Sequence, residues 1–373
     1  MKALHLIKVT GIAGAEKHLL ILLPSLMARG IDVELVALVE PNNRVDSLAE
    51  AAASVGLPFH REVITGNTDP RLIGRLRRLF MDRKPDVVHT HLLHADLFGI
   101  PAARLAGVKR VITSRHNDDS FRRSLPMRAI HAGLWRQVDA GIAISEAIRQ
   151  FCIDVESAPP KKVHTIRYGL PLPVPIIEPR TARAALRESL NLPADSVLIG
   201  VVCRLIEQKG VRYGLDAFAK LAADYPSAHL VIAGDGDQRA ALESQAKRAG
   251  IAKRVHFMGW QKDVQPILAG LDMLLAPSLW EGFGLILIEA MARRLPVIGS
   301  AVSAIPEIVL DGETGILTPP RDVPALENAL RTLLRDEALR RHMGLMGEDR
   351  VDTHFDSRVM VDKTFELYRT IMG

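Results

Sequence analysis

Four prolines in eleven residues mark the segment Gly169-Leu170-Pro171-Leu172-Pro173-Val174-Pro175-Ile176-Ile177-Glu178-Pro179. Because proline fixes φ and has no N–H to donate, this segment cannot join the interior of a sheet and acts as a semi-rigid connector. At 373 residues, the chain also exceeds what one hydrophobic core usually organises. We therefore expect an N-terminal domain over residues 1–172, a linker over 173–182 and a C-terminal domain over 183–355. A last helix over 356–373 is expected to pack back on the first domain.

On both sides of the connector, short apolar runs alternate with helical patterns, which indicates parallel sheets with crossover helices. Several runs are nearly continuous in Val, Ile and Leu, as expected for strands covered by helices on both faces. The predicted fold is α/β, with two doubly wound, Rossmann-like domains and a ligand cleft at the carboxyl ends of their strands. The expected elements of the first half are strands Lys2–Val9, Asp32–Val39, Asp86–His91, Arg110–Ser114, Gly141–Ser145 and Lys162–Ile166, and helices Ala15–Arg29 and Ile73–Arg83. The expected strands of the second half are Ser196–Cys203, Ala228–Ala233, Val255–Met258, Met273–Ala276, Pro296–Gly299 and Gly315–Leu317.

The composition is that of a globular protein, with 48% hydrophobic and 24% charged residues. No apolar run reaches the roughly 18 residues of a membrane span. The start, Met1–Ile7, is too short and too interrupted for a secretion signal. Cys152 and Cys203 are the only cysteines and fall one in each half, which argues against a disulfide framework and for a reducing, cytoplasmic location.

The net charge of +5 has a local origin, because 14 Lys and Arg face 5 Asp and Glu between Arg71 and Arg136. Nucleic acid, an anionic membrane surface and a solvated helix face are three readings of such a stretch. The stretch has no RNA-binding signature, no zinc-finger spacing and few aromatic residues for base stacking. We therefore expect no nucleic-acid partner.

Two cations follow the buried run Val201–Cys203, at Arg204 and Lys209. Fixed cations stabilise the charge that develops on a pyrophosphate leaving group, and the planar arginine and point-like lysine suit two phosphates. Glycines that let phosphate approach the backbone occur at Gly11–Gly14, Gly234–Gly236 and Gly282–Gly284. Surface charges and purely structural turns are the alternative interpretation. The spacing of the first turn does not match the dinucleotide fingerprint, which counts against a dehydrogenase.

Two acids flank the third glycine turn, Glu281 before it and Glu289 in the helix that follows. A carboxylate accepts two hydrogen bonds at once and so suits the vicinal hydroxyls of a ribose or a hexose. The alternative is one capping acid and one acid on an exposed helix face. The pattern favours a nucleotide-sugar site in which each acid binds one of the sugars that flank the pyrophosphate.

The segment Pro277-Ser278-Leu279-Trp280-Glu281-Gly282-Phe283-Gly284-Leu285-Ile286-Leu287-Ile288-Glu289-Ala290-Met291 resembles the E-x7-E motif of retaining glycosyltransferases of family 4 (glycosyltransferase group 1), which have the two-domain GT-B fold. Arg204-Leu205 with Lys209-Gly210 resembles the same family's R-L-x-x-x-K-G motif. Gly234-Asp235-Gly236, Val255–Gly259 and Asp311–Gly315 resemble other recurring stretches. The resemblance runs from the first strand to about Arg321.

By this resemblance, Arg204 and Lys209 would bind the donor diphosphate, Glu289 the ribose and Glu281 the transferred sugar. The rest of the implied donor site is Gly234, Gly282, Phe283, Gly284 and Leu285, with backbone N–H groups of Phe283 and Gly284 assisting.

In the N-terminal half, Ser114-Arg115-His116-Asn117 resembles the segment whose histidine faces the reacting sugar, so His116 is the implied hydrogen-bond partner of that sugar. Gly14 matches a glycine near the phosphates. This chain departs from the family at Ala13, where a glycine is usual, and at Arg167-Tyr168, where many members have Pro-Asn.

The resemblance also implies the reaction, a transfer with retention from a nucleotide-diphosphate sugar to a hydroxyl of a glycan or lipid-linked acceptor. Such transfers build cell-surface polysaccharide, lipopolysaccharide or glycolipid, and the resemblance implies no cofactor and no essential metal. A sugar-nucleotide epimerase of the same fold, which would act without an acceptor, and a non-catalytic nucleotide-sugar or glycan binding protein are the alternatives.

Two further features stay open. His89, His91 and His94 raise a metal hypothesis, since strand alternation puts His89 and His91 on one face, but polar groups lining a cleft explain them as well. The segments Phe121–Ile130 and Ile73–Arg83 mix arginine with large apolar residues. Such segments can dock on anionic lipid, which would place the protein peripherally on the inner face of the cytoplasmic membrane.

Overall fold

The computed structural model describes residues 1–66, 69, 71–174 and 177–373, which form two compact units. Unit 1 contains Met1–Pro171 and Ser357–Gly373, and unit 2 contains Leu172–Asp356. Residues 175 and 176 of the predicted linker lie outside the described residues. The end of that linker, 179–182, is helical, because helix α7 (Pro179–Ser189) begins with a proline whose missing N–H needs no partner there. The Glu178 carboxylate caps this helix by accepting from the Thr181 N–H at 2.6 Å.

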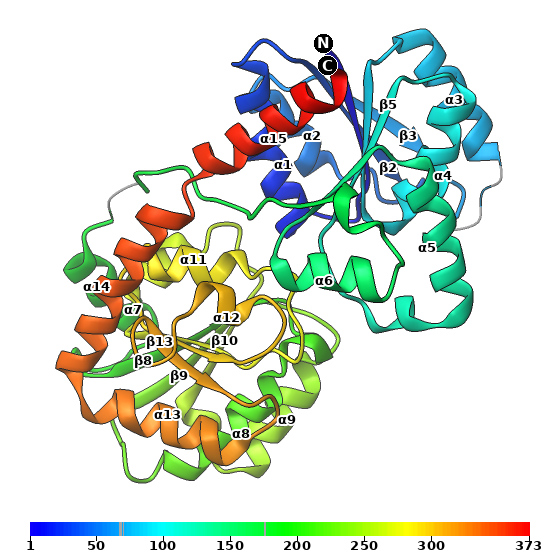
Figure 1. Ribbon diagram of the computed structural model, residues 1–373. Coiled ribbons are helices and arrows are strands. Elements are labelled where there is room, and N and C mark those ends of the chain that lie inside the picture. Colours follow the sequence, from blue (N-terminus) through cyan, green and yellow to red (C-terminus); the bar gives the residue numbers. More distant parts are fainter. Residues whose placement is uncertain (67–68, 70, 175–176) are drawn as a thin grey trace. The chain divides into compact units, whose positions relative to one another are not determined.

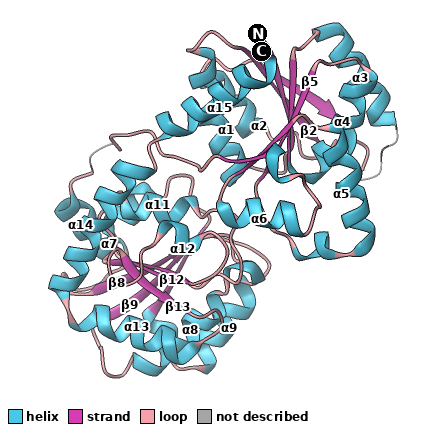
Figure 2. Cartoon of the chain, viewed as in Figure 1, coloured by secondary structure: helices cyan, strands magenta, loops and turns pink. Residues whose placement is uncertain are grey.

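Unit 1, which is blue to green with the red C-terminal helix in Figure 1, is built on a parallel sheet. The described strands of this sheet run in the order β3-β2-β1-β4-β5-β6-β7. Helices lie on both faces of this sheet (Figure 2), so its central strands are buried nearly along their whole length. The strands are β1 (Lys2–Lys8), β2 (Asp32–Val39), β3 (Phe59–Val63), β4 (Val87–His91), β5 (Arg110–Arg115), β6 (Ala140–Ala143) and β7 (Val163–Thr165). The helices are α1 (Gly14–Met27), α2 (Asp46–Ser54), α3 (Arg71–Arg83), α4 (Leu92–Leu105), η1 (Ser120–Arg123), α5 (Leu125–Gln137), α6 (Glu146–Asp154), η2 (Pro160–Lys162) and α15 (Ser357–Met372).

Unit 2 repeats this design, with described parallel strands in the order β10-β9-β8-β11-β12-β13. Its core lies between the sheet and helices α8 and α13, and β9 is buried at every position. The strands are β8 (Val197–Val202), β9 (Ala228–Ala233), β10 (Val255–Gly259), β11 (Met273–Ala276), β12 (Val297–Ser300) and β13 (Gly315–Thr318). The helices besides α7 are η3 (Glu207–Lys209), α8 (Val211–Leu221), α9 (Arg239–Arg248), η4 (Ala252–Arg254), α10 (Gln265–Gly270), α11 (Leu285–Met291), α12 (Ile305–Ile308), α13 (Val323–Arg335) and α14 (Glu337–His354).

Helix α15 belongs to unit 1 although it follows unit 2 in the sequence. It packs against α1 (Figure 1), where Arg29 pairs with Asp362. The Ser357 N–H donates to the Leu170 carbonyl at 2.8 Å, which ties the start of α15 to the end of the first segment of unit 1. Two stretches far apart in the sequence therefore complete one unit.

The prediction of two doubly wound α/β halves is confirmed within each unit. Several predicted elements begin or end one or two residues away from the observed bounds, and two of the differences have a local explanation. Strand β3 is not predicted, because Phe59–Val63 is short, half-buried and rich in polar residues. Strand β6 ends at Ala143, earlier than the predicted Ser145. Ser145 instead caps α6, because its hydroxyl accepts from the Ile148 N–H at 3.1 Å.

Candidate active site

Three loops at the carboxyl edge of the unit 2 sheet are bound to one another through their backbones. Leu205, after β8, donates its N–H to the Asp235 carbonyl at 2.8 Å and accepts from the Gln238 N–H at 2.9 Å. The Gly234 N–H, after β9, donates to the Gly259 carbonyl at 2.8 Å. Because Leu205 is fully buried, it anchors this edge while the neighbouring Arg204 stays exposed. The predicted diphosphate-binding arginine is therefore accessible at a well-ordered edge.

Gly234 is required by this close approach of the loops. Its φ is +145°, and a Cβ at this position would stand 1.8 Å from the Cys203 carbonyl oxygen. Only glycine fits such a contact between backbones. Since the Gly234 N–H already donates to Gly259, the glycine is explained by loop packing; a role in donor binding stays a prediction.

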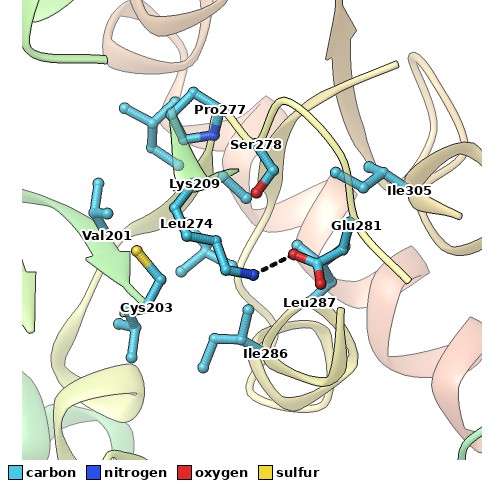
Figure 3. Close-up of a pocket in the computed structure, with 13 residues that line it drawn as sticks. Val201, Cys203, Lys209, Leu274, Pro277, Ser278, Glu281, Ile286, Leu287 and Ile305 are labelled. Carbon is cyan, nitrogen blue, oxygen red and sulfur yellow. Dashed lines mark hydrogen bonds and ion pairs between the residues drawn. The ribbon is translucent and has the colours of Figure 1, made fainter. Parts of the chain in front are cut away.

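The predicted residues Lys209 and Glu281 meet in the structure. The Lys209 ammonium forms an ion pair with Oε2 of Glu281, and the two side chains are only 16% and 14% exposed. Figure 3 shows them reaching toward each other at a small cavity of about 20 Å³, with Cys203 and Ser278 in its lining. A cavity of this size holds about one water molecule. Burial raises the pKa of the Cys203 thiol to about 12, so it is a neutral wall of this cavity at physiological pH.

The loop that carries Glu281 is fixed to the loop that carries Lys209. Gln208 accepts from the Leu279 N–H at 2.7 Å and donates its side-chain amide to the Trp280 carbonyl at 3.0 Å. Gly284 is the N-cap residue of α11 and has a φ of +96°, a conformation that favours glycine. These contacts explain how residues 72 positions apart in the sequence form one site.

The remaining predicted donor residues follow in the same segment. Phe283 is buried and packs edge-on against Phe355, with ring centroids 5.9 Å apart, so its ring anchors the loop. Gly282 precedes it, and the partly buried Leu285 is the first residue of α11.

Glu289 lies in α11, and one of its partners, Gln265, comes from the start of α10. Oε2 of Glu289 accepts from the Gln265 side-chain amide at 3.1 Å, and Arg293 donates to the oxygen of the same amide at 3.1 and 3.2 Å. The two acids of the motif therefore have different partners: Glu281 pairs with Lys209, whereas Glu289 accepts from Gln265 and lies within electrostatic reach of Arg293.

An acidic triplet, Asp235-Gly236-Asp237, also lies at this edge. Spacing of the Asp-x-Asp type can hold a divalent ion on a pyrophosphate. Here Asp235 accepts from the Gly236 N–H at 2.8 Å and from Arg239 at 3.3 Å. Its carboxylate is thus engaged within the protein.

The predicted residues of unit 1, Gly14 and His116, lie at the carboxyl ends of β1 and β5. Gly14 is the exposed first residue of α1, where Glu16 accepts from the Ala13 N–H at 2.9 Å. His116 follows β5 and is partly buried. Its Nε2 lies 3.1 Å from Nδ1 of His91, and its Nδ1 hydrogen bonds to the Tyr168 hydroxyl.

A buried ionic cluster beside His116 was not predicted from the sequence. Arg115 pairs with Asp96 and, at 2.7 Å, with Glu156, which also accepts from Arg122 at 2.8 Å and from the Trp135 indole at 3.0 Å. Burial alone would raise the pKa of Glu156, but the two arginines outweigh it and lower this pKa to about 2. The cluster fixes the loop that carries His116.

Comparison with known proteins gives matches over both units. Residues 12–172 match the family model for glycosyltransferase family 4, and residues 182–350 match the model for glycosyl transferases group 1. The chain is 30% identical over 311 residues to alpha-maltose-1-phosphate synthase of Mycolicibacterium smegmatis, covering 76% of this chain and 79% of that protein. It is 27% identical over 366 residues to the phosphatidyl-myo-inositol mannosyltransferase of Mycobacterium leprae, covering 96% and 93% of the two chains.

Among solved structures, Anabaena Alr3699/HepE in complex with UDP-glucose superposes with a TM-score of 0.88 and 21% identity, covering 99% of this chain and 100% of the other. At this identity the likeness speaks to the fold, and it confirms the predicted GT-B arrangement of two Rossmann-like domains.

Proposed function

This chain belongs to the group 1 glycosyltransferases of family 4, and from that premise we propose that it transfers a hexose with retention from a nucleotide-diphosphate sugar to a hydroxyl acceptor. The observation that carries the proposal is the Lys209–Glu281 pair beside exposed Arg204 at the carboxyl edge of the unit 2 sheet. Two cations and a carboxylate at one sheet edge fit a diphosphate next to a sugar.

The roles divide by what each group can bind. Arg204 and Lys209 would hold the diphosphate and stabilise it as the leaving group. When phosphate engages Lys209, the Glu281 carboxylate is released to accept from sugar hydroxyls. Glu289 would bind the ribose after exchanging its bond to Gln265.

In unit 1, burial lowers the pKa of His116 well below its usual range, so the ring is neutral. A neutral imidazole can hydrogen bond to a sugar without adding a charge, which is the role that we propose for it.

Donor binding and transfer are tested with a panel of UDP-, GDP- and ADP-sugars on the wild type and on Arg204→Ala, Lys209→Met and Glu281→Gln. We expect one nucleotide class to raise the Tm of the wild type, and Arg204→Ala to lower kcat/KM by about 100-fold or more. The matched control is Arg341→Ala, which removes an exposed arginine of α14. If no nucleotide sugar stabilises the wild type, the proposal is wrong.

Retention and acceptor use need a product assay. NMR coupling constants of the product's anomeric proton should match the configuration of the donor. Turnover should require an added acceptor, whereas an epimerase would convert the donor alone. Relatives such as the phosphatidyl-myo-inositol mannosyltransferase support a glycan or lipid-linked acceptor, and thus a place in cell-surface polysaccharide, lipopolysaccharide or glycolipid synthesis.

The transfer is also proposed to need no metal, because Arg204 and Lys209 supply the positive charge that a divalent ion would otherwise bring to the diphosphate. Full activity of protein dialysed against EDTA is the expected result. Loss of activity in EDTA, with recovery on adding Mg²⁺ or Mn²⁺, would point to Asp235-Gly236-Asp237 instead.

For the acceptor side we further propose peripheral attachment to the cytoplasmic face of an anionic membrane. None of the helices within the described ranges is long and apolar enough to cross a bilayer. Helices η1 and α5 expose Phe121 (50%), Leu125 (78%) and Ile130 (41%) beside Arg123 and Arg128. Apolar side chains among arginines suit the interface of an anionic bilayer.

Two arginines of α3 contribute less, because Arg75 pairs with Glu62 and Asp69, and Arg83 pairs with Glu34. Co-sedimentation with phosphatidylglycerol vesicles should decline in a Phe121→Ser/Leu125→Ser variant and not in the control Leu345→Ser. Absence of wild-type binding at low salt would contradict attachment.

A further inference from the structure

His116 lies next to one end of a chain of hydrogen bonds that runs through the core of unit 1. Its Nε2 meets Nδ1 of His91 at 3.1 Å, and Nε2 of His91 meets Nδ1 of His5 at 2.9 Å. Nε2 of His5 meets the Tyr368 hydroxyl at 3.1 Å, and this hydroxyl meets Nδ1 of His89 at 2.6 Å. The chain ends at Ser114, 2.7 Å from Nε2 of His89, and begins at Tyr168, which bonds to Nδ1 of His116.

The members come from five parts of the fold that the parallel register brings together. His5 on β1 pairs in register with His89 on β4, and His91 pairs with Ser114 on β5. Tyr368 comes from α15, and its side chain is fully buried. The side chains of His5, His89 and His91 are likewise fully buried, so their ring nitrogens bond to other members of the hydrogen-bond chain and not to bulk water.

The hydrogen-bond chain restricts which ring nitrogen carries the proton in each of the four histidines. A neutral imidazole carries one N–H donor and one lone pair, and each link needs one proton between its two atoms. If Nε2 of His116 carries the proton, Nδ1 of His91 must accept, and its own proton must stand on Nε2. Repeating this rule through His5, Tyr368 and His89 gives the Nε2-H tautomer at every ring. The opposite start gives Nδ1-H at every ring. If His5 and His89 both donated to Tyr368, the proton of this fully buried hydroxyl would have no acceptor among the described residues, and if both presented lone pairs, the single hydroxyl proton could serve only one of them.

We propose that Tyr368 is a positioning residue, which acts through His5 and His91 to hold the ring of His116 in a single tautomer and orientation. This inference rests on the proposed function for its catalytic consequence, because His116 is the ring assigned to the reacting sugar. When the substrate replaces Tyr168, the fixed tautomer determines whether Nδ1 of His116 donates or accepts the hydrogen bond to it.

A metal ion is the competing explanation of the same residues. Among the described residues, His5, His89 and His91 have ligand atoms within 4.8 Å of one another and could hold a metal. A coordinated nitrogen cannot also keep its hydrogen bond to the next ring. In the structure, however, both nitrogens of His5, His89 and His91 are engaged in the chain. The hydrogen-bond chain therefore accounts for all six ring nitrogens without an ion.

The first test reads the tautomers directly. Multiple-bond ¹H–¹⁵N NMR spectra of the full chain, labelled with ¹⁵N-histidine at pH 7.5, should give one tautomer shared by His5, His89, His91 and His116. In Tyr368→Phe, His89 loses its link to the other three rings, and intermediate ¹⁵N shifts that report mixed tautomers are expected. Two different tautomers in the wild type, or unchanged spectra in Tyr368→Phe, would overturn the proposal. So would a stoichiometric metal in elemental analysis of the purified protein.

The second test measures catalysis. Tyr368→Phe should lower kcat by about tenfold, the loss expected for one misplaced hydrogen bond, with the donor KM changed less than twofold. The matched control is Tyr225→Phe, which removes a hydroxyl that accepts from Arg335 at 2.9 Å in unit 2. A Tyr368→Phe enzyme that keeps the wild-type kcat refutes the positioning role. If the wild type transfers no sugar, the proposed function fails, while the NMR result still decides whether the chain sets the tautomers.

Discussion

Lowering the pH from 7.5 to 5.5 should destabilise unit 1 strongly. Burial lowers the pKa of His5 and of His18 to about 3, whereas both titrate near 6.5 when exposed. The unfolded chain therefore binds protons at these rings before the folded chain does. These two rings cost no unfolding free energy above pH 6.5, where they are neutral in both states. They lower it progressively as the pH falls from 6.5 toward 3.

The magnitude follows from linkage. A histidine that stays neutral in the folded state costs about 1.4 kcal/mol at pH 5.5, since ten unfolded molecules in eleven are then protonated. His5 and His18 together therefore lower the free energy of unfolding by about 3 kcal/mol at pH 5.5. Burial also lowers the pKa of His89, His91 and His116 well below the usual range. These three rings add to the loss in the same direction.

The assay is urea unfolding at the two pH values, followed by the fluorescence of Trp135, which is buried in unit 1. Trp260→Phe and Trp280→Phe remove the other two tryptophans, both of which belong to unit 2. A loss of less than about 2 kcal/mol between pH 7.5 and 5.5 would refute the reasoning. In the matched variant His18→Gln, the loss of unfolding free energy between pH 7.5 and 5.5 should be smaller by about 1.4 kcal/mol.

Three substitutions probe unit 2. Gly234→Ala should lower the Tm of unit 2 by about 5 °C and abolish stabilisation by donor, because the new Cβ collides with a backbone carbonyl. Thermal melts with and without nucleotide sugar measure both effects. An unchanged Tm would contradict the close contact at Gly234. Lys209→Met should cost about 1–3 kcal/mol in urea unfolding, because Glu281 keeps a partly buried charge without its partner, and adding Glu281→Leu should restore part of the loss. Phe283→Ala should cost about 3–5 kcal/mol by the same measurement, since its ring is buried; a loss below about 1 kcal/mol would show that the ring does not anchor the loop.

The sequence predicts those parts of the fold and site that depend on short stretches of chain. Both parallel sheets follow from apolar runs and glycine turns, and Glu281 and Lys209 were identified from motifs. That these two side chains form an ion pair could not be read from the sequence, because it depends on the bonds from Gln208 to the loop before α11. Periodicity says which face a residue occupies and does not name its partner.

The histidine chain shows the same limit more strongly. Strand alternation correctly put His89 and His91 on one face, but His5 joins them only through the register of β1 and β4. The predicted third member, His94, lies instead on α4 beside Phe98. Tyr368 stands 279 positions from His89, so only the packing of α15 on unit 1 brings it there.

The division of unit 1 into two sequence segments has a consequence for biosynthesis. Unit 2 is one continuous stretch, so it needs no residue after Asp356 to complete its fold. Unit 1 must wait, because its buried histidines have no tyrosine hydroxyl between them until Tyr368 emerges. We therefore expect unit 1, although its synthesis begins first, to complete its fold last, when helix α15 packs on it and closes its core.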